Sequence, residues 1–322
     1  MTRIPEHPEV GGQRDREAAR VEALREELLK LLNRWTSSDG KHETAIGALK
    51  LYRFSQPTEP THLLQEPAVY VVLRGRKEVI LGNQTYLYDC SQYLAVSLDA
   101  PVVAKIADAS HEEPCLCLTL AVDPRELAAL IVETDQHAPR DDHDGGALYV
   151  SPVRAPLLDG LVRLLRLLDA PEEIPVLSPL ILREIHYRLL QSERYGRLAQ
   201  MAIGDGRLRR VSGAILWIKE HFAEPLLIEA LAKNVHMSPS ALHQNFKAVT
   251  AMSPIQYQKR LRLQEARRLL VSGAPSAEAV AHEVGYGSAT QFTREYARLF
   301  GHPPRRDVEH VCETAGVRDL IH

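Results

Sequence analysis

The chain has 322 residues, more than one hydrophobic core usually serves, so its length predicts two domains. With 45% hydrophobic and 25% charged residues and no apolar run near the roughly 18 residues of a membrane span, its composition is that of a globular protein and excludes a membrane protein. The net charge of −3 argues against nucleic acid as a partner of the whole chain. Residues 209–322 alone, however, carry 15 Lys and Arg against 11 Asp and Glu, and this net positive charge is the sign that binds DNA.

The N-terminal segment, residues 1–20, is polar, charged and proline-containing, without the apolar stretch and cleavage site of a secretory signal. We expect a flexible tail there, on a cytoplasmic protein. The cysteines of the chain are too unevenly spaced for a disulfide framework, and none forms the C-x-x-C pair of a zinc site. They are Cys90, Cys115, Cys117 and Cys312.

The pattern of the first half of the chain predicts one helix followed by strands. Leucines recur at helical spacing from Val21 to Trp35, which predicts an amphipathic helix packed on the first domain. From Leu49 to Leu120, short apolar runs alternate with turn signals such as Arg74-Gly75 and Gly82-Asn83. Short strands separated by turns in this way are typical of an antiparallel sandwich or barrel.

Helices are expected again after Asp123, whose side chain can cap a helix over 123–133. A loop over 136–146 and helices over 156–168 and 177–190 follow. Six leucines cover one face of the helix expected over 156–168: Leu157, Leu158, Leu161, Leu164, Leu165 and Leu168. Such a face must be buried on its own domain or on a second subunit, and we take it as grounds for a homodimer. Residues 201–208 are expected to be a linker.

The C-terminal part contains an internal repeat, because residues 238–254 and 288–304 match in their pattern. The paired positions are Ser238 and Ser288, Leu242 and Phe292, Phe246 and Tyr296, and Pro254 and Pro304. Upstream of each copy lies a short helical stretch that ends near Ala232 or Ala281. Each copy therefore predicts a helix, a tight turn and a second helix, the pattern of a helix-turn-helix unit.

The residue types at the turns suit this geometry. Gly285 can take the positive φ of a short turn, and His236 stands at the corresponding place in the first copy. Ser238 and Ser288 are suited to cap the second helices. A linker helix over 254–270 would hold the two units at the spacing of adjacent major grooves, about 34 Å apart.

The outward sides of the two second helices carry side chains able to reach base edges and phosphates. In the first copy these are Ser240, His243, Gln244 and Lys247; in the second they are Ala289, Thr290, Gln291, Thr293, Arg294 and Arg298. Glu295 at the flank is the one carboxylate. A bundle with a solvated basic face is the alternative, which the second aligned copy disfavours.

These residues resemble the DNA-binding domain of the AraC/XylS transcription regulators over about 95 residues. The matching stretches are Leu231-Ala232, Met237 to Leu242, Phe246-Lys247, Ser253-Pro254, Arg262-Leu263, Ala266, Leu269-Leu270, Val284 to Tyr286, Phe292 and Gly301. The resemblance implies base contacts from Ser240, His243 and Gln244, and from Ala289, Thr290, Gln291 and Arg294. The chain departs from the family at Gln244, usually arginine, and at Asp307-Val308, usually Tyr-Arg. We therefore expect the second unit to be the stronger anchor.

Residues 21 to about 195 resemble the N-terminal domain of one branch of these regulators. The matching stretches are Glu66-Pro67, Leu73 to Lys77, Tyr88-Asp89, Ser97, Pro101, Glu113-Pro114 and Arg183 to Leu190. The resemblance implies a cupin-like antiparallel β-barrel with flanking helices that senses a small molecule and dimerises. The expected fold is thus a multidomain α+β chain, with a sensing domain over 21–200, an all-α DNA-binding domain over 209–310 and a C-terminal tail over 311–322.

Two groups of residues in the barrel are candidates for chemistry. A catalytic cupin would need a His-x-His pair and further ligands, whereas only His62 and Glu66 stand four apart, so we expect no metal and no cofactor. Cys115 and Cys117 share one face of a strand and would point inward. They are either small buried hydrophobes or thiols that respond to an electrophile or oxidant.

Three functions can be weighed against these sequence features. A ligand-responsive regulator of promoter DNA, with RNA polymerase as a possible further partner, explains the charge distribution, the repeat and the β-rich half together. A cupin-type enzyme with an accessory helical domain lacks a ligand set, a nucleophile with its base or a phosphate-binding loop. A non-specific architectural DNA-binding protein would bind in a salt-dependent way without sequence preference. The sequence favours the first, a sequence-specific regulator and not an enzyme.

Overall fold

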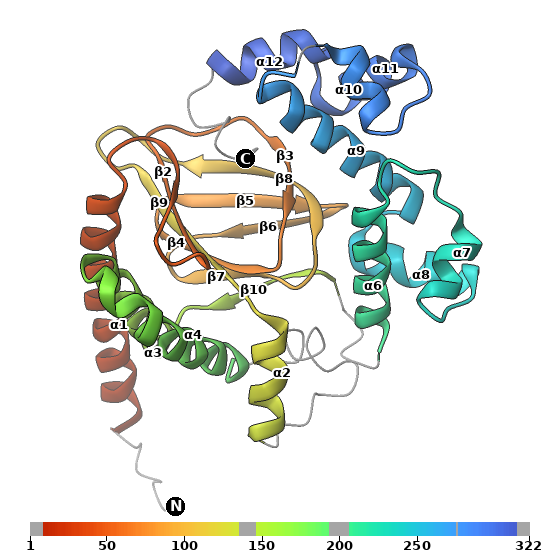
Figure 1. Cartoon of the computed structure of the whole chain (residues 1–322). Coiled ribbons are helices and arrows are strands. Elements are labelled where there is room, and N and C mark those ends of the chain that lie inside the picture. Colours follow the sequence, from red (N-terminus) through yellow and green to blue (C-terminus); the bar gives the residue numbers. More distant parts are fainter. Residues whose placement is uncertain (1–8, 135–145, 193–205, 275, 314–322) are drawn as a thin grey trace, which may run out of the picture.

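The computed structural model describes residues 9–134, 146–192, 206–274 and 276–313. They form a β-rich N-terminal domain and an all-helical C-terminal domain that pack against each other (Figure 1). The predicted multidomain α+β fold is therefore confirmed. Nearly all of the expected loop over 136–146 and most of the expected linker over 201–208 lie outside the described residues. None of the described helices is both long and apolar enough to cross a membrane.

Antiparallel strands form two sheets in the N-terminal domain. The six-stranded sheet has the order β1-β2-β9-β4-β7-β10 and the four-stranded sheet the order β3-β8-β5-β6. The strands are β1 Gly40–Glu43, β2 Leu49–Phe54, β3 Thr61–Gln65, β4 Ala68–Arg74, β5 Arg76–Leu81, β6 Gln84–Tyr88, β7 Gln92–Val96, β8 Ala100–Asp108, β9 Cys115–Ala121 and β10 Leu148–Pro152. The predicted turn at Gly82-Asn83 is confirmed: Leu81 pairs with Gln84, and Gly82 has a φ of 60°.

The six-stranded sheet is buried on both faces, which explains why β9 is apolar along nearly its whole length. Leu116, Leu118 and Leu120 belong to the core under the helices, whereas Cys115 and Cys117 face the four-stranded sheet. The predicted inward orientation of the two thiols is therefore confirmed. It follows from the alternation of side chains along a strand.

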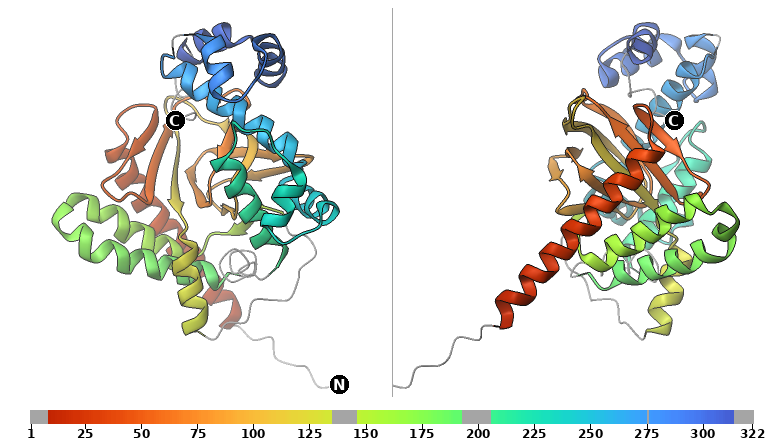
Figure 2. Two further views of the ribbon diagram at one scale, coloured as in Figure 1. Left: turned by 45° about the vertical axis from the view of Figure 1, so that its right-hand side comes forward. Right: turned by 90° about the vertical axis from the view of Figure 1, so that its left-hand side faces the viewer.

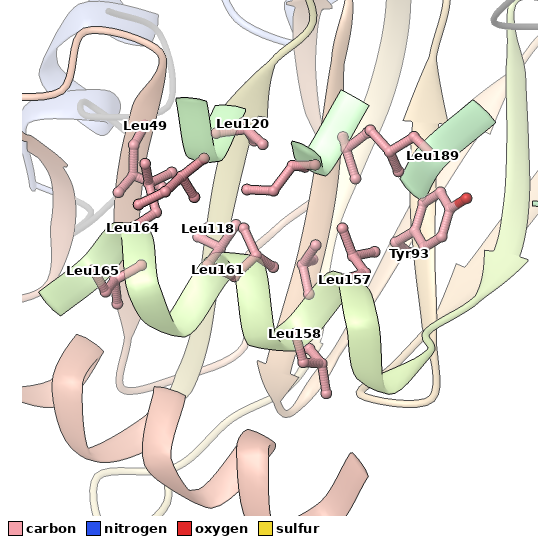
Figure 3. Close-up of a cluster of buried hydrophobic side chains, with 14 of the residues drawn as sticks. Leu49, Tyr93, Leu118, Leu120, Leu157, Leu158, Leu161, Leu164, Leu165 and Leu189 are labelled. Atoms are coloured by element: carbon pink, nitrogen blue, oxygen red, sulfur yellow. The ribbon is translucent and has the colours of Figure 1, made fainter. Parts of the chain in front are cut away.

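Helices cover the outer face of this sheet, as Figures 1 and 2 show. They are α1 Glu9–Trp35, α2 Pro124–Glu133, α3 Ala155–Arg166 and α4 Ile174–Leu190. The six leucines expected on one face are buried within the chain, and Figure 3 shows those of them that belong to α3. They offer no surface to a second subunit, so the ground for a homodimer was wrong. A second correction concerns the tail: α1 begins at Glu9 rather than Val21, so residues 9–20 are helical.

The C-terminal domain is all helical and rests on the barrel. Its helices are α6 Arg207–Glu220, α7 Ile228–Asn234, α8 Pro239–Thr250, α9 Pro254–Val271, α10 Ala277–Glu283, α11 Ala289–Phe300 and α12 Pro304–Glu313. Two contacts meet at Asp99 of the barrel: Lys219 Nζ lies 2.7 Å from its carboxylate, and the Tyr257 hydroxyl donates to its carbonyl at 3.1 Å. Apolar residues of α6, α8 and α9 join the barrel interior in one continuous core.

Candidate nucleic-acid interface

Two helix-turn-helix units lie at opposite ends of α9 (Figure 1). The first consists of α7 and α8, the second of α10 and α11. The predicted caps are confirmed: Ser238 Oγ accepts from the Ala241 amide at 3.2 Å, and Ser288 Oγ accepts from the Gln291 amide at 3.4 Å. The linker helix α9 has 18 residues, which makes it about 27 Å long at 1.5 Å per residue.

The turns of the two units have the predicted backbone conformation. Gly285 has a φ of 85° and His236 a φ of 53°, both in the left-handed region. At Gly285 space is a second requirement, because a Cβ atom there would lie 2.0 Å from the carbonyl oxygen of Ala223. The second unit therefore requires glycine at its turn, whereas the first tolerates a side chain.

The expected recognition residues lie on the outer sides of α8 and α11. Leu242, Phe246, Phe292 and Tyr296 are fully buried on the inner sides. The outer positions are all exposed except Ala289, which is half-buried; the exposed ones are Ser240, His243, Gln244, Lys247, Thr290, Gln291, Thr293, Arg294 and Arg298. Two surfaces of uncharged polar and basic side chains result, one on each unit.

Glu295 takes part in a hydrogen-bond network on the second unit. Its carboxylate accepts from Lys259 Nζ, Gln291 Nε2 and the Tyr286 hydroxyl, each at 3.0 Å. Burial acts to raise the pKa of Glu295, but the hydrogen bonds outweigh it and hold that pKa below its ordinary value. The carboxylate is thus compensated within the protein, and one N–H of the Gln291 amide is engaged with it.

Two expected DNA-contact residues also border the barrel. Lys247 lines a cleft of about 360 Å³ together with the β5–β6 turn, and Arg298 lines another of about 510 Å³ that includes Gly82 of the same turn. Gly82 itself packs against Ala251, between α8 and α9. The β5–β6 turn therefore lies next to the last turn of both recognition helices.

Arg262 of α9 connects the two units through backbone carbonyls, a role that the sequence did not indicate. Its guanidinium donates to the carbonyl oxygens of Phe222 at 2.6 Å and Glu224 at 2.8 Å, before α7, and to that of Gly285 at 2.8 Å in the second turn. Because every residue has a carbonyl, no sequence pattern marks such partners.

Arg267 of α9 is also structural. Its guanidinium forms two hydrogen bonds of 2.8 Å with the Asp307 carboxylate, and the side chains are 8% and 1% exposed. The Tyr296 hydroxyl donates to the same carboxylate at 2.7 Å. Asp307, one of the departures from the family pattern, thereby ties α12 to α9 and α11.

A cavity of about 480 Å³ lies between the mouth of the barrel and the C-terminal domain. Basic side chains from both domains line it, among them Lys50, Lys219 and Arg268. His62, at its edge, has its ring 5.9 Å from that of Phe300. Burial, with the guanidinium groups of Arg260 and Arg267, lowers the pKa of His62 to about 4.

The two inward thiols lie beside a buried lysine. Lys77 Nζ is 3.9 Å from Cys117 Sγ. A hydrogen bond from the Cys115 thiol and the Lys77 ammonium lower the pKa of Cys117 to about 7, against the opposing effect of burial. Cys115 and Cys117 are both free thiols. No group of three or more His, Cys, Asp or Glu suited to hold a metal occurs among the described residues.

Two family profiles match the chain. Residues 45–197 match the AraC-type transcriptional regulator N-terminus, and residues 231–309 match a helix-turn-helix domain. Curated relatives match about a third of the chain. The transcriptional activator RhaS of Salmonella schwarzengrund is 35% identical over 101 residues, which cover 31% of this chain and 35% of that RhaS. RhaS of Escherichia fergusonii is 35% identical over 96 residues, which cover 30% of this chain and 34% of that RhaS. The chain thus spans about a third of these relatives.

Solved structures resemble nearly the whole fold. ToxT from Vibrio cholerae strain SCE256, with an unsaturated fatty acid bound, has a TM-score of 0.55 at 9% identity and covers 83% of this chain and 96% of its own. ToxT from Vibrio cholerae O395 bound to (E)-4-(8-methylnaphthalen-1-yl)but-3-enoic acid has a TM-score of 0.57 at 11% identity, covering 84% and 99%. At 9% and 11% identity, these likenesses concern the fold. The two profiles, each matched to the domain that its description names, establish that the chain belongs to the AraC family of transcriptional regulators.

Proposed function

We propose that the chain is a cytoplasmic, sequence-specific DNA-binding regulator of transcription and that it has no enzymatic activity. The observation that carries the proposal is the pair of capped helices α8 and α11, each with a buried apolar side and an exposed polar and basic side. The helix-turn-helix profile matches this same region, and the RhaS relatives are transcriptional activators. Direct base readout requires such side chains in the major groove.

Footprinting on the DNA upstream of its own gene tests this function. We expect protection of two major-groove segments about one helical turn apart. Arg294→Ala should relax the sequence preference and cost about 1–3 kcal/mol, while Lys247→Ala should weaken all sequences alike. Arg305→Ala on α12, where the side chain is 93% exposed, is the matched control and should change little. Uniform weak protection would instead indicate a non-specific architectural protein.

We propose that a small-molecule effector binds in the cavity between the two domains. The cavity is large enough for a ligand of drug-like size, and its walls combine apolar residues such as Leu63 and Phe222 with basic ones. Both ToxT complexes contain a carboxylic acid. A carboxylic acid with an apolar body is therefore the proposed class, and a rise of the melting temperature of the full chain with octanoate but not octanol tests it.

We also propose that the chain forms a homodimer, but through α4 rather than the buried leucines of α3. Val176, Leu177 and Leu180 of α4 are 68%, 37% and 61% exposed, an apolar patch that a second copy would cover. Light scattering at micromolar concentration should find a dimer that Leu180→Glu converts to monomer. Monomer in the unmodified chain, with and without DNA, would contradict the proposal.

Cys117 is the proposed reactive thiol, because its position beside Lys77 favours the thiolate. Alternate residues of a strand lie about 6.6–6.8 Å apart, at the edge of the range for a disulfide, so we favour an adduct or sulfenic acid over a bond to Cys115. Mass spectrometry after exposure to peroxide or a reactive aldehyde should find modification of Cys117. An unchanged DNA-binding response in the variant Cys115→Ser with Cys117→Ser would contradict a sensory role.

A further inference from the structure

A separate cavity of about 140 Å³ lies where the start of α3 and the end of α4 meet the strands β7 and β10. Among the described residues, none lines both this cavity and the larger one between the domains. Tyr93 of β7 and Ser151 of β10 line it side by side, because they are partners across the two strands. At roughly 30 Å³ per water molecule in the liquid, the space corresponds to about five waters, so it suits a compact group of about five heavy atoms.

Two hydroxyl groups at this cavity are buried and unused. Tyr93 is 2% exposed, and its Oη has no hydrogen-bond partner among the described residues. Figure 3 shows this hydroxyl on the side of the ring away from Leu157 and Leu161, so it does not point into the leucine cluster. Ser192 Oγ, just after α4, is likewise buried without a partner in the described part of the chain. Because a buried hydroxyl without a partner is costly, both favour a hydrogen-bonding group in the cavity.

The charged side chains that line the cavity are basic. Arg154 precedes α3 and Arg188 lies in the last turn of α4, whereas no carboxylate of the described residues lines the space. Within the described ranges, the Arg188 guanidinium makes one hydrogen bond, to Glu184 at 3.3 Å, and that carboxylate also accepts from Arg163 at 2.6 Å. Since a guanidinium has five N–H donors, Arg188 retains donors for a further acceptor.

The two helix ends at the cavity do not decide the sign of a ligand. The start of α3 is the positive end of its helix dipole and the end of α4 is the negative end of its own, so their effects oppose each other. At the start of α3, the Ala155 amide already donates to Glu17 Oε1 at 3.2 Å. The charge preference therefore follows from Arg154 and Arg188, which favour an anion.

A phosphate group suits this set of donors better than a carboxylate does. Two hydroxyls and two guanidinium groups line the cavity. A phosphate monoester presents three strong acceptor oxygens, whereas a carboxylate presents two. The planar fork of arginine also matches phosphate oxygens in pairs. A phosphate ion, with one phosphorus and four oxygen atoms, has the size that the cavity admits.

We propose that this cavity is a binding site for a phosphate group, free or at the end of a small monoester, in which Tyr93 Oη and Ser192 Oγ donate to its oxygens. Arg154 and Arg188 supply the positive charge that offsets its own. The site is distinct from the proposed effector cavity and does not depend on it. A bound phosphate links β7 to α3 and α4, so the stability of the N-terminal domain should depend on the phosphate concentration.

Thermal unfolding of the full chain over a phosphate titration tests this site, with sodium chloride used to hold the ionic strength constant. We expect the melting temperature to rise with inorganic phosphate or methyl phosphate and to rise less with acetate. The tighter of the two phosphates identifies the free ion or the monoester as the source. Tyr93→Phe should weaken phosphate binding about 10–100-fold, the range for one hydrogen bond to a charged group. Without phosphate it should leave the melting temperature unchanged, because the hydroxyl has no partner to lose.

The arginine and its controls complete the test. Arg188→Met should weaken phosphate binding about tenfold or more, and Arg188→Lys should weaken it less, because the charge remains but the fork is lost. Tyr88→Phe is the matched control, since Tyr88 is also buried with an unpartnered hydroxyl among the described residues but does not line this cavity; it should not change phosphate binding. Arg166→Met, at the other end of α3, should not change it either.

Three results would overturn the proposal. The first is that neither phosphate compound raises the melting temperature of the unmodified chain. The second is that Tyr93→Phe and Arg188→Met respond to phosphate as the unmodified chain does. The third is that Arg294→Ala alone loses the response, because the phosphate then binds at the DNA-binding surface of α11 instead.

Discussion

Replacing Arg267 by methionine should destabilise the second helix-turn-helix unit strongly. The change removes both 2.8 Å hydrogen bonds to Asp307 and leaves a carboxylate that is 1% exposed with only the Tyr296 hydroxyl as a donor. Removal of one partner of a buried pair costs about 3–5 kcal/mol, because the remaining charge stays desolvated. The guanidinium also stacks 4.6 Å from the ring of Phe300, and that contact is lost too. Urea unfolding of the full chain, followed by circular dichroism at 222 nm, measures the loss.

Two comparisons isolate the buried pair. Arg268→Met, on the same helix, breaks the Glu265 pair, in which the side chains are 44% and 30% exposed, and it should cost about 0–1 kcal/mol. The double variant Arg267→Met with Asp307→Leu removes both charges and should recover most of the stability. The reasoning fails if Arg267→Met costs no more than Arg268→Met, or if the double variant is no more stable than the single one.

Three further outcomes are expected. Gly285→Ala should abolish protection of one of the two grooves while the other remains, since its Cβ would lie 2.0 Å from Ala223 O; footprinting at saturating protein resolves this. Arg262→Lys should weaken DNA binding about tenfold in a gel-shift titration, because a compact ammonium does not reproduce the planar fork that bonds the loop before α7 and the second turn together. The pKa of His62 is about 4 in the folded chain against about 6.5 in the unfolded chain. The contribution of neutral His62 to stability is therefore present above pH 6.5 and is lost as the pH falls towards 4. The urea midpoints at pH 7 and pH 5 should differ less in His62→Leu than in the unmodified chain.

Local rules predicted much of the fold correctly. The serine caps at Ser238 and Ser288, the left-handed turn at Gly285 and the two-residue hairpin at Gly82 each depend on a few neighbouring atoms, so residue type and spacing suffice. The inward orientation of Cys117 follows from strand alternation alone. These features required no knowledge of distant contacts.

Distant contacts were not predictable in the same way. An apolar helix face such as that of α3 needs a cover, but only the tertiary structure identifies the cover as the chain's own sheet. Arg262 and Arg267 belong by composition to a basic helix, yet their partners are carbonyls of a loop and a carboxylate forty residues away in sequence. For the same reason the buried position of Lys77 beside Cys117 is visible only in three dimensions.

The contacts of α9 suggest how a proposed effector would act on both units together. Gln264 and Arg268 of α9 line the large cavity, and Arg262 on the same helix bonds to the loop before α7 and to the turn of the second unit. A ligand seated there would favour whichever placement of α9 gives it more contacts, and it can shift the equilibrium only by that difference in affinity. Moving the population from 1:99 to 99:1 takes about a 10⁴-fold difference. Because Lys247 and Arg298 border the β5–β6 turn, even a small movement of α9 against the barrel alters the space available to DNA at both recognition helices.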